Sequence, residues 1–475
     1  MATNTSHSDQ YNKNIFSLYP VSFTEMSDAL ARAISSSVQF NIVLSNTFFQ
    51  SYPIYFNTIS EYDKSWKDLS ELDKILRSRF QKAFDEKFRE EAFVNTLSNT
   101  IANYSQLAKI TGLGKLYKYF SNRSAVWNND FIEPIRDTIG RTPSEKICEI
   151  EKFSVFHYKR HSDENTSYEV VSSAGGNNTP LLIIYAFINR HYILDLLPEV
   201  SVIRSLLDQG LDIFAADWGT PSAYDRSMTL GHFVNRYLDK SIDFIRKITK
   251  SEKVSLFGYC WGGDLALMYS AVHPEKVKNL ITIATPGDFD LDDSLLATWA
   301  KAIKVNYLLD AFGNLPGAVL NAAFILRNPI EYSHKYFHFF EQPRSLEAVT
   351  EFFATETWLY DSPPIIGEIY RQFTEYCYKQ NLLIKNKMRI EDGYNGTNDG
   401  TVINLKNINM PFLNILAKKD DLVAPNSSKA LNDALTESHD KSLIELDSGH
   451  VGLMIGKNAH KELWPKVGEW LKKRS

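Results

Sequence analysis

Two kinds of hydrophobic pattern divide the chain near residue 150. Before that point apolar residues recur at spacings of three and four among charges of both signs, most clearly over 66–88. This spacing is typical of amphipathic helices. The sequence therefore predicts a helical N-terminal region over 1–150, with 136–144 as a connector. A helix that packs within its own domain is the simplest interpretation of 66–88, because a membrane-surface helix would be richer in Lys and Arg.

Beyond residue 150 short apolar runs alternate with helical stretches, which is typical of a largely parallel sheet. No comparable run occurs over 287–386, which is rich in aromatic residues. We predict that this stretch is a mostly helical cap insertion that covers a site. It would interrupt a catalytic domain over 151–475. The predicted strands are 153–157, 181–186, 212–217, 254–257, 280–284, 412–417 and 442–446.

Composition and charge exclude several classes of protein. The 475 residues are 44% hydrophobic and 23% charged, which is typical of a globular chain. A net charge of −5 gives no general attraction for nucleic acid. The three cysteines lack the paired spacing of a metal site and favour a reducing compartment. The longest apolar run is far shorter than the roughly 20 residues of a membrane span. We therefore expect a soluble cytoplasmic protein with no metal.

The sharpest local signal follows the predicted strand 254–257. Gly258, Cys260 and Gly262 form a G-x-C-x-G motif that precedes a helical stretch. The motif is typical of a nucleophile elbow with cysteine in place of serine, because small residues on both sides let strand and helix approach closely. The alternative is a glycine-rich turn that holds an inert buried cysteine. The strand before the motif and the helix after it favour the elbow.

An acid and a base follow in the chain order that such an elbow requires. Asp420 comes after strand 412–417, and His450 comes after strand 442–446 on a glycine-flanked loop. Taken alone, Asp420 is also typical of an ordinary turn, and His450 is also typical of an ordinary surface histidine. Order, spacing and strand-end position together predict a triad of Cys260, Asp420 and His450 in an α/β-hydrolase fold.

Acyl transfer also needs two backbone N–H groups that donate to the developing oxyanion. We expect them from Trp261, directly after the nucleophile, and from the turn after strand 181–186, where we choose Ile188. A cysteine nucleophile also indicates which kind of substrate the site takes. A thiolate that attacks a thioester yields another thioester, so the acyl group stays activated for transfer to an alcohol. An acyltransferase benefits from this, whereas a hydrolase gains little.

At this point the chain resembles the polyhydroxyalkanoate synthases, and most of all the class III catalytic subunit. The similar segments run in order from about residue 153 to the C-terminus. They are F-I-N-R-H-Y-I-L-D at 187–195, D-W-G at 217–219, G-Y-C-W-G-G at 258–263, F-G-N-L-P-G at 312–317, W-L-Y-D-S-P at 358–363, Y-K-Q-N-L at 378–382, L-K-N-I-N-M-P at 405–411, D-D-L-V-A-P at 420–425 and G-H at 449–450.

The resemblance implies an enzyme that takes (R)-3-hydroxyacyl-CoA, most often 3-hydroxybutyryl-CoA, releases CoA and builds an intracellular polyester through an acyl-cysteine. It implies catalytic roles for Cys260, Asp420 and His450, and no cofactor, since the CoA thioester is the substrate. It also implies a homodimer at cytoplasmic polyhydroxyalkanoate granules. Asp421 stands where relatives commonly carry His. Because about 150 additional residues precede the similar segments, the need for a helical partner subunit stays open.

Two other functions compete with a polyester synthase. One is a cysteine-dependent hydrolase of the same fold, such as an intracellular polyester depolymerase or a lactone hydrolase. The other is a non-catalytic protein that coats granules through its N-terminal helices and aromatic insertion, although the three triad residues argue against it. Within the synthase hypothesis, Asp420 acts either through His450 or directly on the attacking hydroxyl, and both routes stay open.

Overall fold

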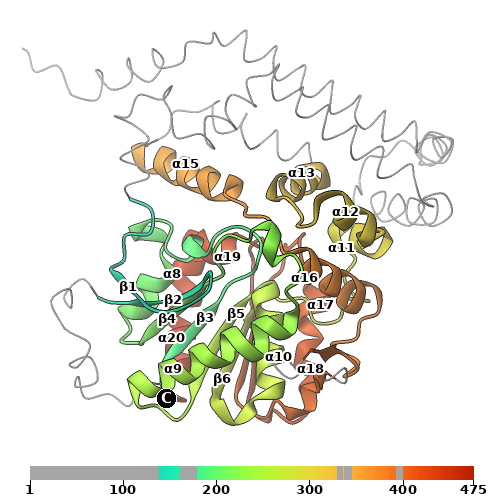
Figure 1. Cartoon of the computed structure of the whole chain (residues 1–475). Coiled ribbons are helices and arrows are strands. Elements are labelled where there is room, and N and C mark those ends of the chain that lie inside the picture. Colours follow the sequence, from blue (N-terminus) through green and yellow to red (C-terminus); the bar gives the residue numbers. More distant parts are fainter. Residues whose placement is uncertain (1–137, 161–178, 329–334, 336–344, 392–399) are drawn as a thin grey trace, which may run out of the picture. The chain divides into compact units, whose positions relative to one another are not determined.

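The computed structural model describes residues 138–160, 179–328, 335, 345–391 and 400–475 (Figure 1). Eight strands form one sheet in the order β1-β2-β4-β3-β5-β6-β9-β10. The pairings β1–β2 and β2–β4 are antiparallel, and the others are parallel. The strands are β1 Ser144–Ile150, β2 Phe153–Tyr158, β3 Leu181–Ile184, β4 Ile213–Asp217, β5 Val254–Tyr259, β6 Val277–Ile283, β9 Phe412–Ala417 and β10 Lys441–Leu446.

All seven predicted strands are present, with ends shifted by up to three residues. β9 has the predicted bounds, whereas β6 begins at Val277 rather than at 280. Six of these strands are recognisable because their residues are nearly all buried, and β5 and β9 have no exposed position, whereas β10 at the edge of the sheet has no buried residue. Continuous apolar runs of this kind are expected of parallel strands that are covered on both faces.

The boundary predicted at residue 150 is misplaced, because the sheet begins earlier. β1 covers Ser144–Ile150 and pairs with β2 in antiparallel register, so these residues belong to the sheet and not to a helical region. Three of the seven carry charges, and none is fully buried. An edge strand with one open side tolerates such polar positions, which hides it from a search for apolar runs. The predicted helix 66–88 lies outside the described residues.

Helices cover both faces of the sheet. In Figure 1, α9 and α10 lie in front of it and α20 lies behind; α10 contacts β3, β5 and β6, while α20 contacts α8. The helices outside the segment between β6 and β9 are α8 Val202–Leu207, α9 Asp239–Thr249, α10 Trp261–Val272, α17 Pro425–Lys429, α18 Leu431–Ala434, α19 Gly452–Ile455 and α20 Trp464–Lys472. The π-helical turns η7 His232–Leu238 and η11 Ala459–Leu463 continue directly into α9 and α20.

The described residues between β6 and β9 are mostly helical. They also include a short antiparallel pair, β7 Arg389–Ile390 with β8 Thr401–Val402. Figure 1 shows α11, α12, α13 and α15 grouped at one end of the sheet, where β5 leads into α10. We refer to these helices, with α16 and η9, as the cap. Its helices are α11 Leu295–Ala302, α12 Val305–Phe312, α13 Gly317–Arg327, α15 Leu346–Tyr360, α16 Gly367–Gln372 and the π-helical η9 Phe373–Lys379.

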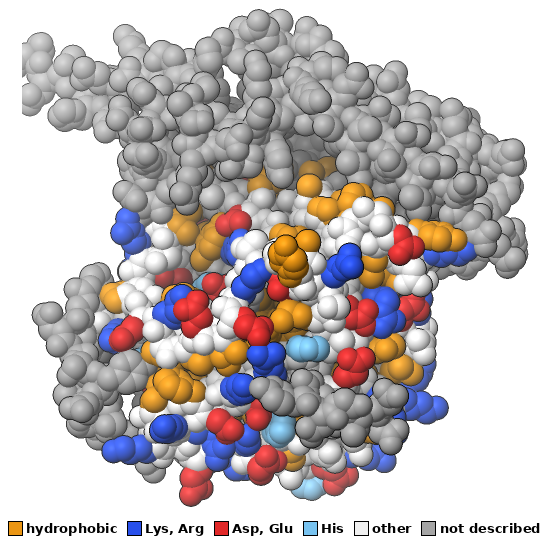
Figure 2. Space-filling view, viewed as in Figure 1, with side chains coloured by type: hydrophobic (Ala, Val, Ile, Leu, Met, Phe, Trp, Pro, Cys, Tyr) orange, Lys and Arg blue, Asp and Glu red, His pale blue; other side chains and the backbone are white. Residues whose placement is uncertain are grey.

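Acidic and basic side chains are interspersed on the face of the described residues seen in Figure 2. Ion pairs among the described residues include Lys276 with Asp239 and Arg474 with Asp440. Among the described residues, no helix is both long enough and apolar enough to span a membrane.

Candidate active site

Cys260 lies at the junction between β5 and α10, as the motif predicts. Its backbone has φ 53° and ψ −129°, a conformation that residues with a side chain rarely adopt. A Cβ added to Gly258 would lie 2.4 Å from Gly263 Cα, and one added to Gly262 would lie 2.1 Å from Ile184 O. Glycine is therefore required at both positions. The turn presents a partly buried thiol at the carboxyl end of the central strand.

The predicted acid and base form a hydrogen bond. His450 Nδ1 lies 2.7 Å from Asp420 Oδ2, and both side chains are almost fully buried, at 7% and 2% exposure. Asp420 Oδ1 accepts two backbone N–H groups, from Leu422 and Val423, each at 2.9 Å. The carboxylate is thus held in one orientation by three donors, and it holds the imidazole in turn.

Cys260 is the third residue of the predicted triad. Cys260 lies close enough to His450 to influence the pKa of its imidazole. Since Asp420 occupies Nδ1, the thiol is left with Nε2. Burial lowers the pKa of His450, but the charge and hydrogen bond of Asp420, together with Cys260, outweigh it and raise the pKa to about 10. The imidazole is therefore a strong enough base to take the proton of a thiol.

The two residues predicted to supply oxyanion donors lie at the start of α10 and in the turn after β3. Trp261 is the first residue of α10, where backbone N–H groups have no partner within the helix. Ile188 lies in the turn after β3 and is partly exposed. The contact of Gly262 with Ile184 O brings this end of β3 against the start of α10. The assignment of these two amides stays a prediction.

The Trp261 side chain joins the elbow to the cap. Its ring stacks on Phe373 with centroids 4.3 Å apart and an interplanar angle of 2°. Its Nε1–H donates to Tyr378 Oη at 3.2 Å. Both partners belong to η9, so the residue after the nucleophile is fixed by the cap as well as by the helix.

Buried groups that the sequence did not single out surround the triad. Tyr259 Oη donates to His450 O at 3.3 Å, and its ring stacks on that of Tyr185 at 5.5 Å. Asp264 is fully buried in α10, and its carboxyl oxygens have no hydrogen-bond partner among the described residues. Burial and the nearby Cys260 raise the pKa of Asp264 well above its usual range. Tyr259 lies inside the elbow motif, but only the fold reveals that Asp264 is covered.

Asp421, the residue after the triad acid, also contacts the cap. Its carboxylate pairs with Arg327, the last residue of α13. The Asp421 side chain is 53% exposed and that of Arg327 is 19% exposed. This pair links the loop after β9 to the cap at a position where sequence analysis noted a departure from relatives.

Comparison with known proteins establishes the family. A family model of the alpha/beta hydrolase fold matches residues 179–457. The chain is 35% identical over 336 residues to the poly(3-hydroxyalkanoate) polymerase subunit PhaC of Allochromatium vinosum, over 70% of this chain and 90% of that protein. The chain belongs to the poly(3-hydroxyalkanoate) polymerase family. This confirms the predicted family, its enzyme class and the α/β-hydrolase fold.

Other polymerases of this family give a consistent comparison. The PhaC subunit of Synechocystis is 34% identical over 343 residues, with 71% of this chain and 86% of that protein covered. The PhaC subunit of Haloferax mediterranei is 38% identical over 341 residues, and the match spans 71% of this chain but only 65% of that protein. The family relation therefore holds for about 70% of this chain.

Proposed function

We propose that this chain is a polyhydroxyalkanoate synthase that transfers (R)-3-hydroxyacyl groups, principally 3-hydroxybutyryl, from CoA to Cys260 and then to a growing polyester. The observation that supports the proposal is the hydrogen bond between His450 and Asp420, with Cys260 close enough to raise the pKa of His450, on a member of the polymerase family. A cysteine in this position conserves the energy of the thioester, which an ester-forming polymerase needs and a hydrolase does not.

In the first half-reaction His450 takes the proton of Cys260, and the thiolate attacks the thioester carbonyl. The oxyanion that forms accepts hydrogen bonds from the amides of Trp261 and Ile188. Collapse of this intermediate breaks the bond to the CoA sulfur, which leaves as a thiol with the proton from His450. The CoA thioester supplies the activation of the acyl group, so the step needs no separate cofactor.

In the second half-reaction the 3-hydroxyl of another unit or chain end attacks the acyl-cysteine. His450 removes the hydroxyl proton and then returns it to the sulfur of Cys260 as the ester forms. We propose that Asp420 acts through His450 rather than on the hydroxyl. The support for this is that its carboxylate is buried and its oxygens already accept from His450, Leu422 and Val423.

The decisive experiment is incubation of the full chain with 3-hydroxybutyryl-CoA, with free thiol and turbidity followed together. A synthase releases CoA and becomes turbid as polymer accumulates. Release of CoA with only free 3-hydroxybutyrate would instead support the hydrolase. No release of CoA at all would contradict both and support the granule-coating alternative. Cys260→Ala is the matched control, since it removes the nucleophile alone.

We also propose that the N-terminal region replaces or recruits a helical partner subunit and sets homodimer formation and attachment to cytoplasmic granules. The support is the amphipathic pattern of 66–88, with an apolar stripe that must pack on something. Because β1 belongs to the sheet, the test should delete residues 1–137 rather than 1–150. The truncated chain should keep a reactive Cys260 but lose polymer formation and granule association. Unchanged activity and unchanged size by light scattering would show the region to be dispensable.

A further inference from the structure

The turn after β3 is fastened to the cap by one side chain. Asn189 Nδ2 donates to Trp358 O at 3.2 Å, to Leu359 O at 2.9 Å and to Ser362 Oγ at 2.8 Å. These acceptors lie at the C-terminal end of α15 and just after it, about 170 positions away in the chain. The amide has only two N–H groups, so one of them is shared between acceptors. We refer to 358–362 as the clamp segment.

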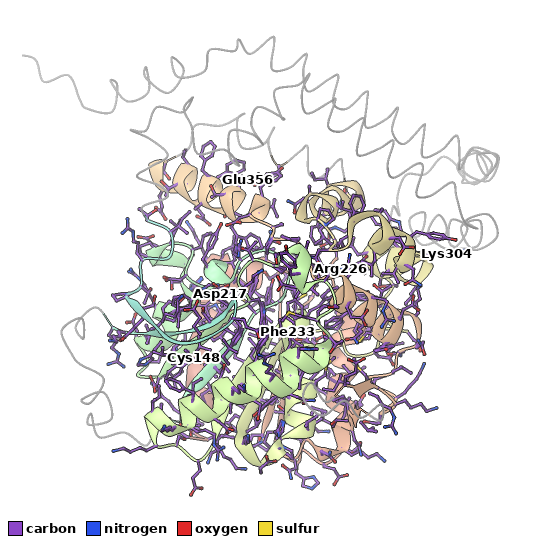
Figure 3. The ribbon with its side chains drawn as sticks, viewed as in Figure 1. Cys148, Asp217, Arg226, Phe233, Lys304 and Glu356 are labelled. Atoms are coloured by element: carbon purple, nitrogen blue, oxygen red, sulfur yellow. The ribbon has the colours of Figure 1, made fainter. Side chains whose placement is uncertain are left out.

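The clamp segment makes further contacts with the turn after β3. Trp358 Nε1–H donates to Arg190 O at 2.7 Å, and Arg190 Nε lies 3.3 Å from Asp361 Oδ1. Arg190 Nη1 also donates to Gly219 O at 3.0 Å, directly after β4. Figure 3 labels Asp217 at the end of β4 and Glu356 on α15, and so marks the two elements that Arg190 joins.

Burial and backbone conformation both favour asparagine at position 189. It is 8% exposed, and its backbone has φ +60°, in the left-handed region that Asn tolerates better than most residues. A buried amide with satisfied donors holds its neighbours firmly. Its immediate neighbour in the chain is Ile188, the predicted oxyanion donor. On the opposite side, the end of β3 is in close contact with Gly262 at the start of α10.

We infer that Asn189 is a positioning residue for acylation: it couples the clamp segment of the cap to the Ile188 amide, so that the oxyanion hole is complete only when this segment is docked. The inference rests on the proposed function and on the choice of Ile188. It assigns the cap a part in the chemistry that is separate from covering the site. An oxyanion donor displaced by even a short distance loses most of its effect, because transition-state stabilisation depends on preorganised geometry.

The experiment compares two reactions of the same thiol in the full chain. Alkylation of Cys260 by iodoacetamide is a displacement at carbon that forms no oxyanion, whereas acylation by p-nitrophenyl acetate or 3-hydroxybutyryl-CoA does. Mass spectrometry of the peptide that contains Cys260 measures both rates. Asn189→Gly removes the side chain and keeps a residue suited to positive φ. Asn189→Asp keeps the shape of the side chain but replaces its N–H donors with a carboxylate oxygen. This oxygen would face the carbonyl oxygens of Trp358 and Leu359.

Asn314→Ala is the matched control. Its Nδ2 donates to Ser222 O at 2.7 Å and its Oδ1 accepts from Gly367 N at 3.1 Å, so it also ties the cap to a core loop, but not to the turn after β3. We expect both Asn189 variants to be acylated at least tenfold more slowly than wild type while alkylation stays within twofold. In Asn314→Ala the ratio of the two rates should not change.

Two results would overturn the inference: unchanged acylation in the Asn189 variants, or an equal loss of alkylation, which would mean a general disturbance of the site. Failure of the proposed function has a different signature. In that case the wild type reacts with p-nitrophenyl acetate but not with 3-hydroxybutyryl-CoA, and the comparison of variants with the simple ester still decides the role of Asn189.

Discussion

The two sides of the active site are held together in different ways. On the sheet side Cys260, Asp420 and His450 follow β5, β9 and β10. Asp420 accepts hydrogen bonds from two backbone N–H groups just after it, and it also bonds to His450. On the cap side the contacts are made by side chains from distant parts of the chain, such as Asn189 with 358–362. We therefore expect the sheet side to determine which reaction is possible and the cap side to determine how well the site is assembled.

The largest effect should come from the sheet side, at the nucleophile. Cys260→Ala should lower the release of CoA by roughly 10⁴-fold or more, because no other group can carry the acyl chain. The rate of CoA release by Cys260→Ser should also fall steeply, since a hydroxyl is a weak nucleophile in a site arranged for a thiolate. A thiol-release assay with 3-hydroxybutyryl-CoA measures both. Near-normal turnover by the alanine variant would show that Cys260 is not the nucleophile.

Asp420→Asn should separate the two half-reactions. The carboxylate raises the pKa of His450, and deprotonation of a hydroxyl depends on that basicity more than deprotonation of a thiol does. We expect a single burst of CoA to survive and subsequent elongation to slow by about 100-fold or more. His450→Gln should lose the burst as well. Rapid-quench analysis of labelled enzyme distinguishes the steps, and an Asn variant without acyl-enzyme would refute this division.

On the cap side, Phe373→Ala should weaken the contact between η9 and the elbow. Phe373 is fully buried and stacks on Trp261, so its truncation should cost about 3 kcal/mol of stability. Hydrogen exchange should increase in 367–379 before it increases in β5. Phe352→Ala, a partly exposed residue of α15, serves as the control for loss of a cap aromatic ring. Equal exchange in both variants would mean that Trp261 does not anchor the cap.

The sheet side should also show a characteristic dependence on pH. The pKa of His450 is raised to about 10 in the folded chain, against about 6.5 when unfolded. Its contribution to stability is therefore complete below pH 6.5 and lost as the pH rises towards 10. We expect the melting temperature of wild type to fall relative to that of His450→Gln across this window. A constant difference between the two would contradict the raised pKa.

The smallest effect should come from the pair of Arg327 with Asp421. Because the Asp421 side chain is half exposed, a double-mutant cycle with alanine should give a coupling of about 1 kcal/mol or less. The coupling should shrink further in concentrated salt. If it were instead large and independent of salt, this pair would be a main attachment of the cap, and the two sides would be less separate than we describe.

The sequence predicted the strands and the turn at Cys260 well because their signals are local. Strand 254–257 and Gly258, Cys260 and Gly262 lie together, and the elbow needs small residues at fixed positions. The cap contacts had no such signal, since nothing in the chain near Asn189 reveals acceptors about 170 positions away. β1 was missed because an edge strand needs no apolar run. Asp264 was missed because its burial depends on what packs over α10.

The position of β1 has a practical consequence for protein engineering. β1 forms one outer edge of the sheet and β10 the other, and β2, β4 and β3 separate β1 from β5, which leads to Cys260. A purification tag or surface anchor joined just before Ser144 would thus enter the sheet at β1, with three strands between it and β5. Its attachment would leave the loops after β5, β9 and β10 untouched. This edge is the natural place to immobilise the sheet for assays of the Cys260 thiol, because a support joined there replaces the N-terminal region that we propose polymer formation requires.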